Sequence, residues 1–494
     1  MGIGRAAKTR KGILVAVLVF SGCTTLPQTR NPDWDRDGAE AVATLQAMIR
    51  FDTINPPQPD SGRRNADETT LLRWVARELA TDGIDSDLYE SAPGRGNLVA
   101  RVRGSGEKRP ILLMAHVDAV NVDTRMWEVP PLSGEIRDGV LWGRGALDDK
   151  GMAAAAVQVL RMLARSGLPL RRDVLVMLNA DEESGGDYGA KFMRDRHGEK
   201  LECEFVLNEG GRIALDAQGR ITQISLSPAE KIYNDFRLWI PGASGHSSVP
   251  RPPNAVYEMA RILAKLESFE TPIRVTQTVA AYFAAIAGRP ENAAWAEWMR
   301  AGDAESAGRL AAAKPEYNAI LRTTVVPTVV KGGIRVNVLP PSVEVNFNAR
   351  LLPGEKLREL IDAMARHVGF ERFDVLRAAE FESWLARKPS HPAFIIDMED
   401  VDAPASPLET EAVRAIREVS KRLAPDAAVV PTLLTGATDS RFFREKGVSC
   451  YGIHPCPTTD EERASVHNHN ERVRVDSVAW GVRWLYEIVV ELAR

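Results

Sequence analysis

The sequence predicts an α/β fold, in which buried strands and helices alternate around one central mixed sheet. Three apolar runs, at 111–117, 173–180 and 205–208, are each short enough for a buried strand, and each stops at a group of polar residues. An alanine-rich stretch at 152–166 follows the first run and has the composition of a helix. Because ligands collect where the strands of such a sheet end, the polar groups after the three runs are candidates for a binding site.

The chain before the first run is predicted to contain two helices and a strand. Helical periodicity covers 39–51, and a second helix is expected over 67–82 with Asp67 or Thr69 as its N-cap. A short apolar stretch at 97–102 is predicted to be a strand that leads into the first run. Folded structure is therefore expected to begin near Ala39.

The first 23 residues differ in kind from the rest. Several arginines and lysines within 5–11 precede an uncharged run at 12–20, which is too short to cross a bilayer core of about 30 Å but suits a signal peptide. The run is followed by Ser-Gly-Cys23, which resembles the processing site of bacterial lipoproteins, where the cysteine is lipidated. We therefore expect 1–23 to be a lipoprotein-type signal peptide of an exported bacterial protein, either periplasmic or membrane-anchored. Cleavage without lipidation and retention as an uncleaved anchor are the alternatives.

Composition excludes other classes. The 494 residues suffice for about three domains, and a net charge of -4 leaves no electrostatic footprint for nucleic acid. Besides Cys23 there are three cysteines without CxxC spacing, at 203, 450 and 456, so neither a disulfide framework nor a cysteine zinc site is expected. Any metal must therefore bind histidine and carboxylate. The proline-containing segment 24–38 is predicted to be a linker.

His116 and Asp118 end the first run. Residues two apart on a strand project from the same face, so the imidazole and the carboxylate would lie together. A metal-binding histidine commonly donates its other ring N–H to a carboxylate. A core histidine paired with an aspartate is the alternative, and this pair alone favours that alternative.

Acidic residues follow the other strands as well. Asp148 and Asp149 lie in a glycine-flanked turn before the alanine-rich helix, where one of them could instead stabilise the helix N-terminus. The second run ends in three successive acids, 181–183, and the third is followed by Glu209. Two like charges about 4 Å apart repel by about 4 kcal/mol at an effective dielectric of 20, so such a cluster favours a bound cation. A solvated acidic loop would explain one of these groups, but all of them together with His116 favour a metal site.

In order along the chain, these motifs and His467-x-x-Asn470-Glu471 resemble the di-zinc metallopeptidases that include carboxypeptidase G, aminoacylase, acetylornithine deacetylase and succinyl-diaminopimelate desuccinylase. The resemblance covers about residues 40–490. It implies that Asp148 bridges two Zn²⁺ ions, for which Co²⁺ or Mn²⁺ could substitute. The ligands that it implies are His116 and Glu209 for one ion, and Glu183 and His467 for the other.

The resemblance also implies the remaining catalytic roles. Asp118 would orient His116, and Asp148 and Asp149 would be joined by the cis peptide of the family. Three ligand carboxylates and a hydroxide balance two divalent ions, which leaves Glu182 free. Glu182 matches the general base that takes a proton from water and passes it to the leaving nitrogen.

The middle of the chain is predicted to be an inserted domain. Segments 231–240, 332–341 and 343–350 are expected to be strands, and a helix is expected from Asn254. This part resembles the αβ sandwich of the family that serves as lid or dimerisation domain. The predicted boundaries are a catalytic domain over 39–229 and 403–494, with the lid over 230–402.

Three residues of the lid match functional positions of the family. His246 matches a histidine that stabilises the oxyanion, supplied in dimeric members by the partner subunit; an ordinary loop histidine is the alternative. Asn337 and Arg350 match residues that grip a substrate carboxylate. A helical stretch over 280–321 resembles the larger Gly-X carboxypeptidases and N-fatty-acyl-amino-acid hydrolases.

We therefore expect an exported zinc hydrolase that releases a C-terminal amino acid from peptides or N-acyl amino acids, with a homodimer among the assemblies it allows. The alternatives within the family are a dipeptidase and a biosynthetic deacetylase or desuccinylase, which export disfavours. A membrane-tethered binding protein on the same fold is the alternative from another class, but no catalytic residue is missing.

Overall fold

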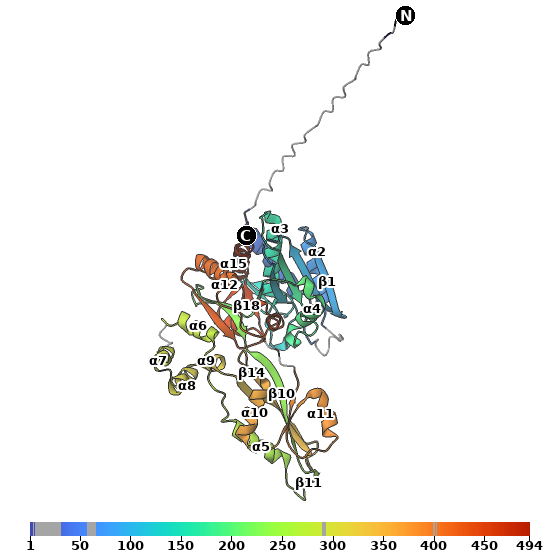
Figure 1. The fold of residues 1–494 in the computed structure, drawn as a ribbon, viewed down its shortest axis with the longest axis vertical. Helices are drawn as coiled ribbons and strands as arrows, with labels where there is room; N and C mark the ends of the chain where they lie inside the picture. The colour runs from blue at the N-terminus through green and yellow to red at the C-terminus, as the bar shows by residue number, and fades with distance from the viewer. Residues whose placement is uncertain (3, 5–30, 57–65, 289–292, 399–400, 402) are drawn as a thin grey trace.

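The computed structural model describes residues 1–2, 4, 31–56, 66–288, 293–398, 401 and 403–494. Most of the predicted signal peptide, including Cys23, and residues 24–30 of the predicted linker therefore lie outside the described residues. The first and last parts of the chain form a larger domain, and the middle of the chain forms an elongated domain that projects from it (Figure 1). No helix among the described residues is long and apolar enough to cross a membrane.

The larger domain is built on a mixed ten-stranded sheet, as expected for a mixed central sheet. Strands β3, β6 and β7 pair side by side and run parallel, with β3 in the middle. The strands of this sheet are β1 (Ser86–Ala92), β2 (Arg95–Val102), β3 (Ile111–His116), β6 (Val174–Asn179), β7 (Phe205–Asn208), β8 (Arg212–Leu215), β9 (Ile221–Glu230), β17 (Ala428–Leu434), β18 (Ser449–Gly452) and β19 (Pro457–Thr458). A small second sheet contains β4 (Glu135–Arg137), β5 (Val140–Trp142) and β20 (Arg472–Arg474).

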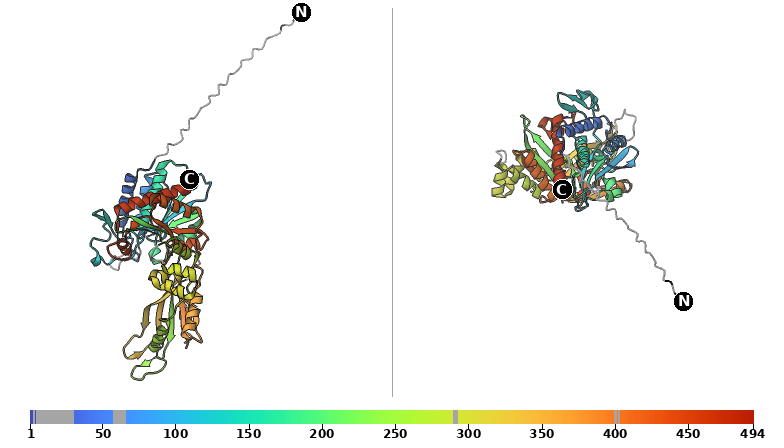
Figure 2. Two further views of the ribbon diagram at one scale, coloured as in Figure 1. Left: turned by 90° about the vertical axis from the view of Figure 1, so that its left-hand side faces the viewer. Right: turned by 90° about the horizontal axis from the view of Figure 1, so that it is seen from above.

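Helices cover both faces of the large sheet (Figure 2). One face packs against α1 (Trp34–Ile49), α2 (Glu68–Ala80), α3 (Lys150–Ser166), α12 (Glu411–Leu423) and α15 (Val475–Ala493). The other face packs against α4 (Ala190–His197) and α13 (Ser440–Arg444). Short helical segments η1 (Thr124–Met126), η2 (Glu182–Ser184), η3 (Gly198–Lys200) and α14 (Asp460–Ala464) lie in the connections.

The projecting domain is a five-stranded sheet with helices on both faces. Helices α5 (Ala255–Leu266) and α10 (Leu357–Val368) pack on one face, and α11 (Ala378–Leu385) packs on the other. Its strands are β10 (Ile232–Pro241), β12 (Thr324–Gly332), β14 (Ser342–Leu351), β15 (Asp374–Arg377) and β16 (Ala393–Ile396). At the far end, β11 (Gly245–His246) and β13 (Val338–Leu339) form a short ribbon.

Where the structure describes it, with 289–292 left out, the helical stretch between the two domains contains α6 (Gln277–Ala285), α7 (Ala293–Ala301), α8 (Ala304–Ala313) and α9 (Pro315–Leu321). Although it lies within the predicted lid, it packs against the larger domain. Val279 and Phe283 of α6 share a buried cluster with Val430 and Leu433 of β17. Figure 1 shows these helices grouped at the side of the junction.

Two expected elements differ from the structure. The prediction of a strand over 332–341 is wrong: β12 ends at Gly332, Gly333 takes a positive φ of 74°, and only Val338 and Leu339 pair further on. An exposed glycine pair thus ends the strand, although apolar and polar residues continue to alternate in the sequence after it. Folded structure also begins before Ala39, because the Asp33 side chain accepts a hydrogen bond from the Arg36 N–H and caps α1.

Candidate metal centre

Three polar groups meet because three parallel strands end at one edge of the sheet. β6, β3 and β7 are neighbours, so their carboxyl ends lie together. His116 is the last residue of β3, Glu182 and Glu183 follow β6, and Glu209 follows β7. The sheet order therefore gathers side chains that are up to 93 positions apart by number (116 to 209).

Asp148 faces both histidines of the predicted site. Its Oδ1 lies 3.0 Å from Nε2 of His116, and its Oδ2 lies 3.1 Å from Nε2 of His467. The same Nε2 of His467 lies 3.1 Å from Oε1 of Glu183. One carboxylate thus presents a separate oxygen to each half of the cluster, which is the arrangement needed to bridge two ions.

The other half contains Glu209 and Glu182. Oε1 of Glu209 lies 3.8 Å from Nε2 of His116. Two groups of three offer ligand atoms within 4.8 Å of one another: His116 with Asp148 and Glu183, and His116 with Glu182 and Glu209. The distances alone therefore do not distinguish Glu182 from the proposed metal ligands.

Electrostatics in the cluster calls for positive charge. Burial, and then the Glu209 carboxylate, raise the pKa of Glu182 well above its usual range; burial and Asp148 do the same for Glu209. Hydrogen bonds to Asp148 and Glu183 raise the pKa of His467 to about 10. Buried carboxylates with few donors are stabilised by a cation, so the donor set fits divalent metal ions.

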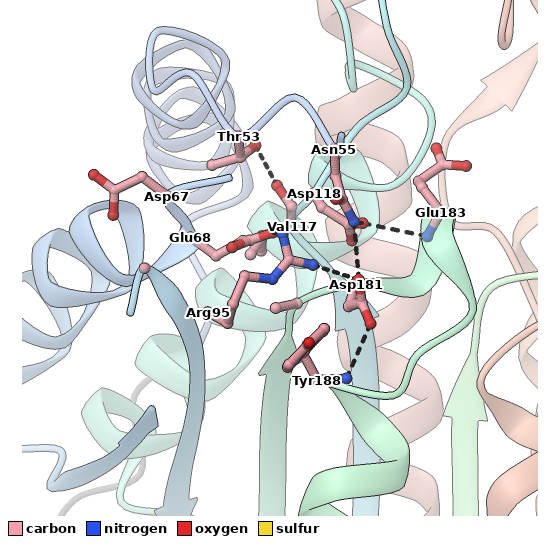
Figure 3. Close-up of polar contacts among 12 residues, drawn as sticks. Thr53, Asn55, Asp67, Glu68, Arg95, Val117, Asp118, Asp181, Glu183 and Tyr188 are labelled. Carbon is pink, nitrogen blue, oxygen red and sulfur yellow. Dashed lines mark hydrogen bonds and ion pairs between the residues drawn. The ribbon is translucent and has the colours of Figure 1, made fainter. Parts of the chain in front are cut away.

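Asp118 contacts His116 and is itself held in place. The backbone carbonyl of Asp118 lies 3.1 Å from Nδ1 of His116, and its carboxylate Oδ1 lies 3.3 Å away. The carboxylate accepts hydrogen bonds from Asn55 Nδ2 at 2.9 Å and from the backbone N–H groups of Glu182 and Glu183 at 3.1 and 3.2 Å. The carboxylate therefore links His116 to the loop that bears the two glutamates, and Figure 3 shows its contact to the backbone of Glu183.

A buried network supports that loop from behind. Figure 3 shows Asp181 accepting hydrogen bonds from Asn55, from Arg95 at 2.5 Å and from the backbone N–H of Tyr188 at 2.9 Å. Arg95 also pairs with Glu68 at 3.0 Å. Asp181, the first of the three successive acids, thus points away from the cluster and is structural.

The turn bearing Asp148 is held by Glu471. The Glu471 carboxylate accepts hydrogen bonds from the backbone N–H groups of Gly145, Leu147 and Asp148 at 2.8–3.0 Å, and it pairs with Arg144 at 2.7 Å. The peptide bond between Asp148 and Asp149 is cis. Asp149 occupies the N-cap position of α3, yet among the described residues its buried carboxylate has no hydrogen-bond partner.

The cluster opens to solvent on one side. It lines a cavity of about 320 Å³ together with Gly210, Ala437, Thr438 and Arg463. The His467 side chain is 52% exposed, whereas that of His116 is 1% exposed, so the open side of the cluster is the side with His467.

The lid residues divide between two ends of the projecting domain. His246 pairs with Val338 in the distal ribbon, and the Asn337 carbonyl accepts a hydrogen bond from Ser247 N–H at 3.0 Å. Arg350 lies at the near end of β14, opposite Tyr233. Since Ser342 marks the distal end of β14, about 25 Å of strand separates the two groups. Within one chain, His246 and Asn337 do not meet the cluster.

Several supporting residues were not predicted from the sequence. Asn55 and Arg95 carry no motif signal, because Asn55 lies in the connection between α1 and α2 and Arg95 is an isolated polar residue at the start of β2. Glu471 is part of the His467-x-x-Asn470-Glu471 motif, but the sequence did not predict what it does. Its complete burial and its ion pair with Arg144 show that it holds the turn of Asp148. Arg441, which donates to the Gly185 carbonyl at 2.8 Å, follows the small-residue loop 435–440.

Comparisons with known proteins agree with this geometry. A family model described as Peptidase family M20/M25/M40 matches residues 112–491. The chain is 30% identical over 396 residues to the human N-fatty-acyl-amino acid synthase/hydrolase PM20D1, a match that covers 77% of this chain and 74% of that protein.

Solved structures share the fold. An M20 family metallo-carboxypeptidase, Sso-CP2 from Sulfolobus solfataricus, superposes with a TM-score of 0.64 at 17% identity, covering 91% of this chain and 98% of the other. The Bacillus subtilis YXEP protein, described as a dinuclear metal binding peptidase from the M20 family, superposes with a TM-score of 0.58 at 13% identity, covering 93% and 99%.

Proposed function

The chain belongs to peptidase family M20/M25/M40 and is a metallopeptidase-type hydrolase, and from this premise we propose that it releases a C-terminal amino acid from peptides or N-acyl amino acids. The observation that carries the proposal is the position of Asp148, with one carboxylate oxygen facing His116 and the other facing His467. The similarity to a human N-fatty-acyl-amino acid synthase/hydrolase supports the choice of substrates.

Two Zn²⁺ ions are the proposed cofactors. His116 and Glu209 would hold one ion, Glu183 and His467 the other, and Asp148 would bridge them. The support comes from ligand atoms within 4.8 Å of one another and from a structural relative described as dinuclear. When bound, such ions polarise a scissile carbonyl and lower the pKa of water to about 7.

Glu182 is the proposed general base. Its neighbour Glu183 contacts His467, whereas no hydrogen bond or ion pair of the Glu182 carboxylate is recorded among the described residues. A carboxylate oxygen of Glu182 would accept a proton from the attacking water and return it to the leaving nitrogen. Asp118 would act as a positioning residue, since it holds both His116 and the backbone of Glu182.

Arg350 is the proposed carboxylate-binding residue, and Arg441 is its proposed partner. Burial lowers the pKa of Arg350, Tyr233 and Asp235 raise it, and the Arg441 charge makes a smaller lowering contribution. The Arg441 Nε is buried without a hydrogen-bond partner among the described residues. A pocket lined by Arg441 and Tyr233 adjoins the metal cavity at Ala437. A substrate carboxylate bound there would pair with Arg441, and Arg350, whose guanidinium lies 4.3 Å from the centre of the Tyr233 ring, would be its second partner.

His246 and Asn337 are proposed to act in a partner subunit. The distal ribbon is too far from the cluster of its own chain, and β12 is an edge strand with exposed Val326 and Val330, at 52% and 62%. An exposed apolar edge strand can pair with a second copy. In the resulting homodimer, each lid would bring its His246 to the other subunit, where the imidazole would stabilise the oxyanion.

Export is proposed from the N-terminal sequence alone. The basic segment, the uncharged run and Cys23 support a lipoprotein-type signal peptide and a periplasmic or membrane-anchored location. Metabolic labelling with a radioactive fatty acid would test lipidation. Incorporation that Cys23→Ala abolishes is expected, and equal incorporation by the variant would contradict lipidation at this residue.

A substrate panel tests the reaction. The zinc-loaded protein is incubated with N-blocked dipeptides, free-amine dipeptides and N-acyl amino acids, and amino acid release is followed by mass spectrometry. Release from blocked substrates that a chelator stops is the expected result. Cleavage of free-amine dipeptides alone would favour a dipeptidase, and binding without release from any substrate would favour a binding protein.

A further inference from the structure

We propose that an apolar cleft beside the metal cavity, formed by α6 and α9 against β17, binds the acyl chain of an N-acyl amino acid. The inference rests on the proposed function, because it names the substrate class and the place of its apolar part. The residues of α6 to α9 would then determine specificity.

The cleft has the size and lining of a site for an apolar group. Its volume is about 570 Å³, within the range of about 300–1,000 Å³ typical of small-molecule sites. Its apolar walls are Tyr282 of α6, Pro315, Tyr317 and Ile320 of α9, and Leu433 and Leu434 of β17.

The cleft is continuous with the metal cavity. Gly210, Gly211, Leu434 and Arg463 line both spaces. Gly210 and Gly211 directly follow Glu209, so the boundary begins one residue from a proposed ligand. Gly210 has a φ of +114°, and a Cβ there would lie 3.1 Å from Cδ2 of Leu434, so a side chain would narrow the passage. A chain attached to a carbonyl group at the metal site can therefore extend directly into the cleft.

The far wall of the cleft is closely packed. Phe283 stacks on Trp295 with ring centroids 4.4 Å apart and meets Tyr317 edge-on at 4.9 Å. The Lys231 ammonium, at the start of the projecting domain, donates hydrogen bonds to the carbonyls of Ala319 and Arg322 at 2.9 and 3.0 Å. The wall is thus tied to both domains, and a preformed wall lowers the entropic cost of ordering a flexible chain.

The two ends of the substrate are assigned to the two spaces that adjoin the metal cavity. The pocket with Arg441 adjoins the metal cavity at Ala437, whereas the cleft adjoins it at Gly210 and Gly211. The cleft itself contains Arg212, Glu316 and Arg463, and the pocket with Arg441 contains as many acidic as basic side chains, so charge does not choose between the two spaces. The apolar walls of the cleft assign the acyl chain to it, which leaves the free carboxylate for the side with Arg441. The amide bond between them would then lie at the metal cluster.

The test compares acyl chain lengths on one amino acid. The rate constant kcat/KM is measured for N-acetyl, N-octanoyl and N-dodecanoyl substrates with the wild-type protein, Ile320→Glu and Asn318→Glu. Asn318 lies on the same helix but does not line the cleft, so its variant is a matched control. Each buried methylene is worth up to about fourfold in binding, so the wild type is expected to prefer the dodecanoyl substrate over the acetyl substrate by more than about tenfold.

The variants distinguish a loss of acyl-chain binding from a loss of folding. Ile320→Glu is expected to lower kcat/KM for the dodecanoyl substrate at least about tenfold and for the acetyl substrate less than about twofold, because only the longer chain meets the new charge. Asn318→Glu should change neither. Equal losses on both substrates, or a wild type indifferent to chain length, would overturn the proposal. A larger loss on N-blocked apolar peptides than on the dodecanoyl substrate would assign the cleft to a peptide.

A binding measurement keeps the cleft testable if the proposed function fails. Should no substrate be hydrolysed, calorimetric titration of dodecanoyl and acetyl amino acids into the wild type and Ile320→Glu decides the question. Tighter binding of the dodecanoyl compound that Ile320→Glu abolishes would support an acyl cleft without the hydrolase. Equal binding of both compounds would overturn the cleft as well.

Discussion

The Glu471 carboxylate accepts a hydrogen bond from the backbone N–H of Asp148 at 3.0 Å, across 323 positions of sequence. Through this contact and those to Leu147 and Gly145, the end of the chain holds the turn that presents Asp148 to both histidines. The position of Asp148, and with it the proposed metal ligation, therefore depends on a residue that is not itself a proposed ligand.

Glu471→Gln is expected to weaken zinc binding by about 10- to 100-fold, because the amide N–H₂ group faces backbone donors and leaves Arg144 unpaired. Zinc titration monitored by a competing chelator measures the change. Glu461→Gln is the matched control, since its carboxylate is 84% exposed and pairs with Arg472 at the surface. Unchanged affinity in Glu471→Gln would show that the turn is held without this carboxylate.

Glu182→Gln is expected to lower kcat by about a hundred- to ten-thousandfold while two zinc ions remain bound, because a base is lost and no ligand. Glu183→Gln, next to it, should lose zinc instead, since Glu183 contacts His467. Metal content is measured by elemental analysis alongside activity. Equal zinc loss in both variants would make Glu182 a ligand, as its closeness to His116 and Glu209 permits.

Arg350→Ala should raise KM for substrates with a free C-terminal carboxylate and leave the corresponding amides little changed. A bidentate guanidinium contact to carboxylate is lost, and Arg350→Lys should restore only part of it, because an ammonium cannot form the same fork. The ratio of kcat/KM between acid and amide is the measurement. If Arg350→Ala leaves this ratio unchanged, Arg350 does not bind the substrate carboxylate.

Mixing two inactive variants tests the role of His246 in a partner subunit. Each subunit of a Glu182→Gln and His246→Ala heterodimer lacks one group, but one of its two sites is complete if His246 acts across the interface. Random exchange of subunits is then expected to restore about a quarter of the wild-type activity. Either variant alone, incubated identically, is the control. If the mixture stays as inactive as its components, His246 either acts within its own chain or has no catalytic function.

The stability of the protein should rise with pH above neutrality through Lys231. Burial, and then the Arg350 charge, lower the pKa of Lys231 to about 7 from 10.5. Between these values the unfolded chain binds more protons at this site than the folded chain, so the free energy of unfolding increases with pH. Lys231→Met removes this contribution. From pH 7 to pH 10 the thermal unfolding midpoint of the wild type should therefore rise relative to that of Lys231→Met. A difference between the two midpoints that does not change with pH would show that Lys231 stays protonated in the folded protein.

Local patterns in the sequence were enough to predict the strands at 111–117, 173–180 and 205–208 and the acidic groups that follow them. A buried strand must be apolar along its length, and charged residues at its end stand out against that run. The resemblance then identified the family, which the match over 112–491 confirms. The helix boundaries were less well predicted, as the cap at Asp33 shows, because one hydrogen bond moves an end by several residues.

The tertiary structure alone decided which distant groups meet. The order β6-β3-β7 joins His116 to Glu183 and Glu209, and Glu471 reaches back to the turn of Asp148. The tertiary structure also places His246 far from the cluster. It packs α6, which the sequence assigned to the lid, against β17 of the larger domain. A sequence pattern records the environment of each residue, whereas neighbours across a sheet are selected by the packing of the whole chain, for which no local signal exists.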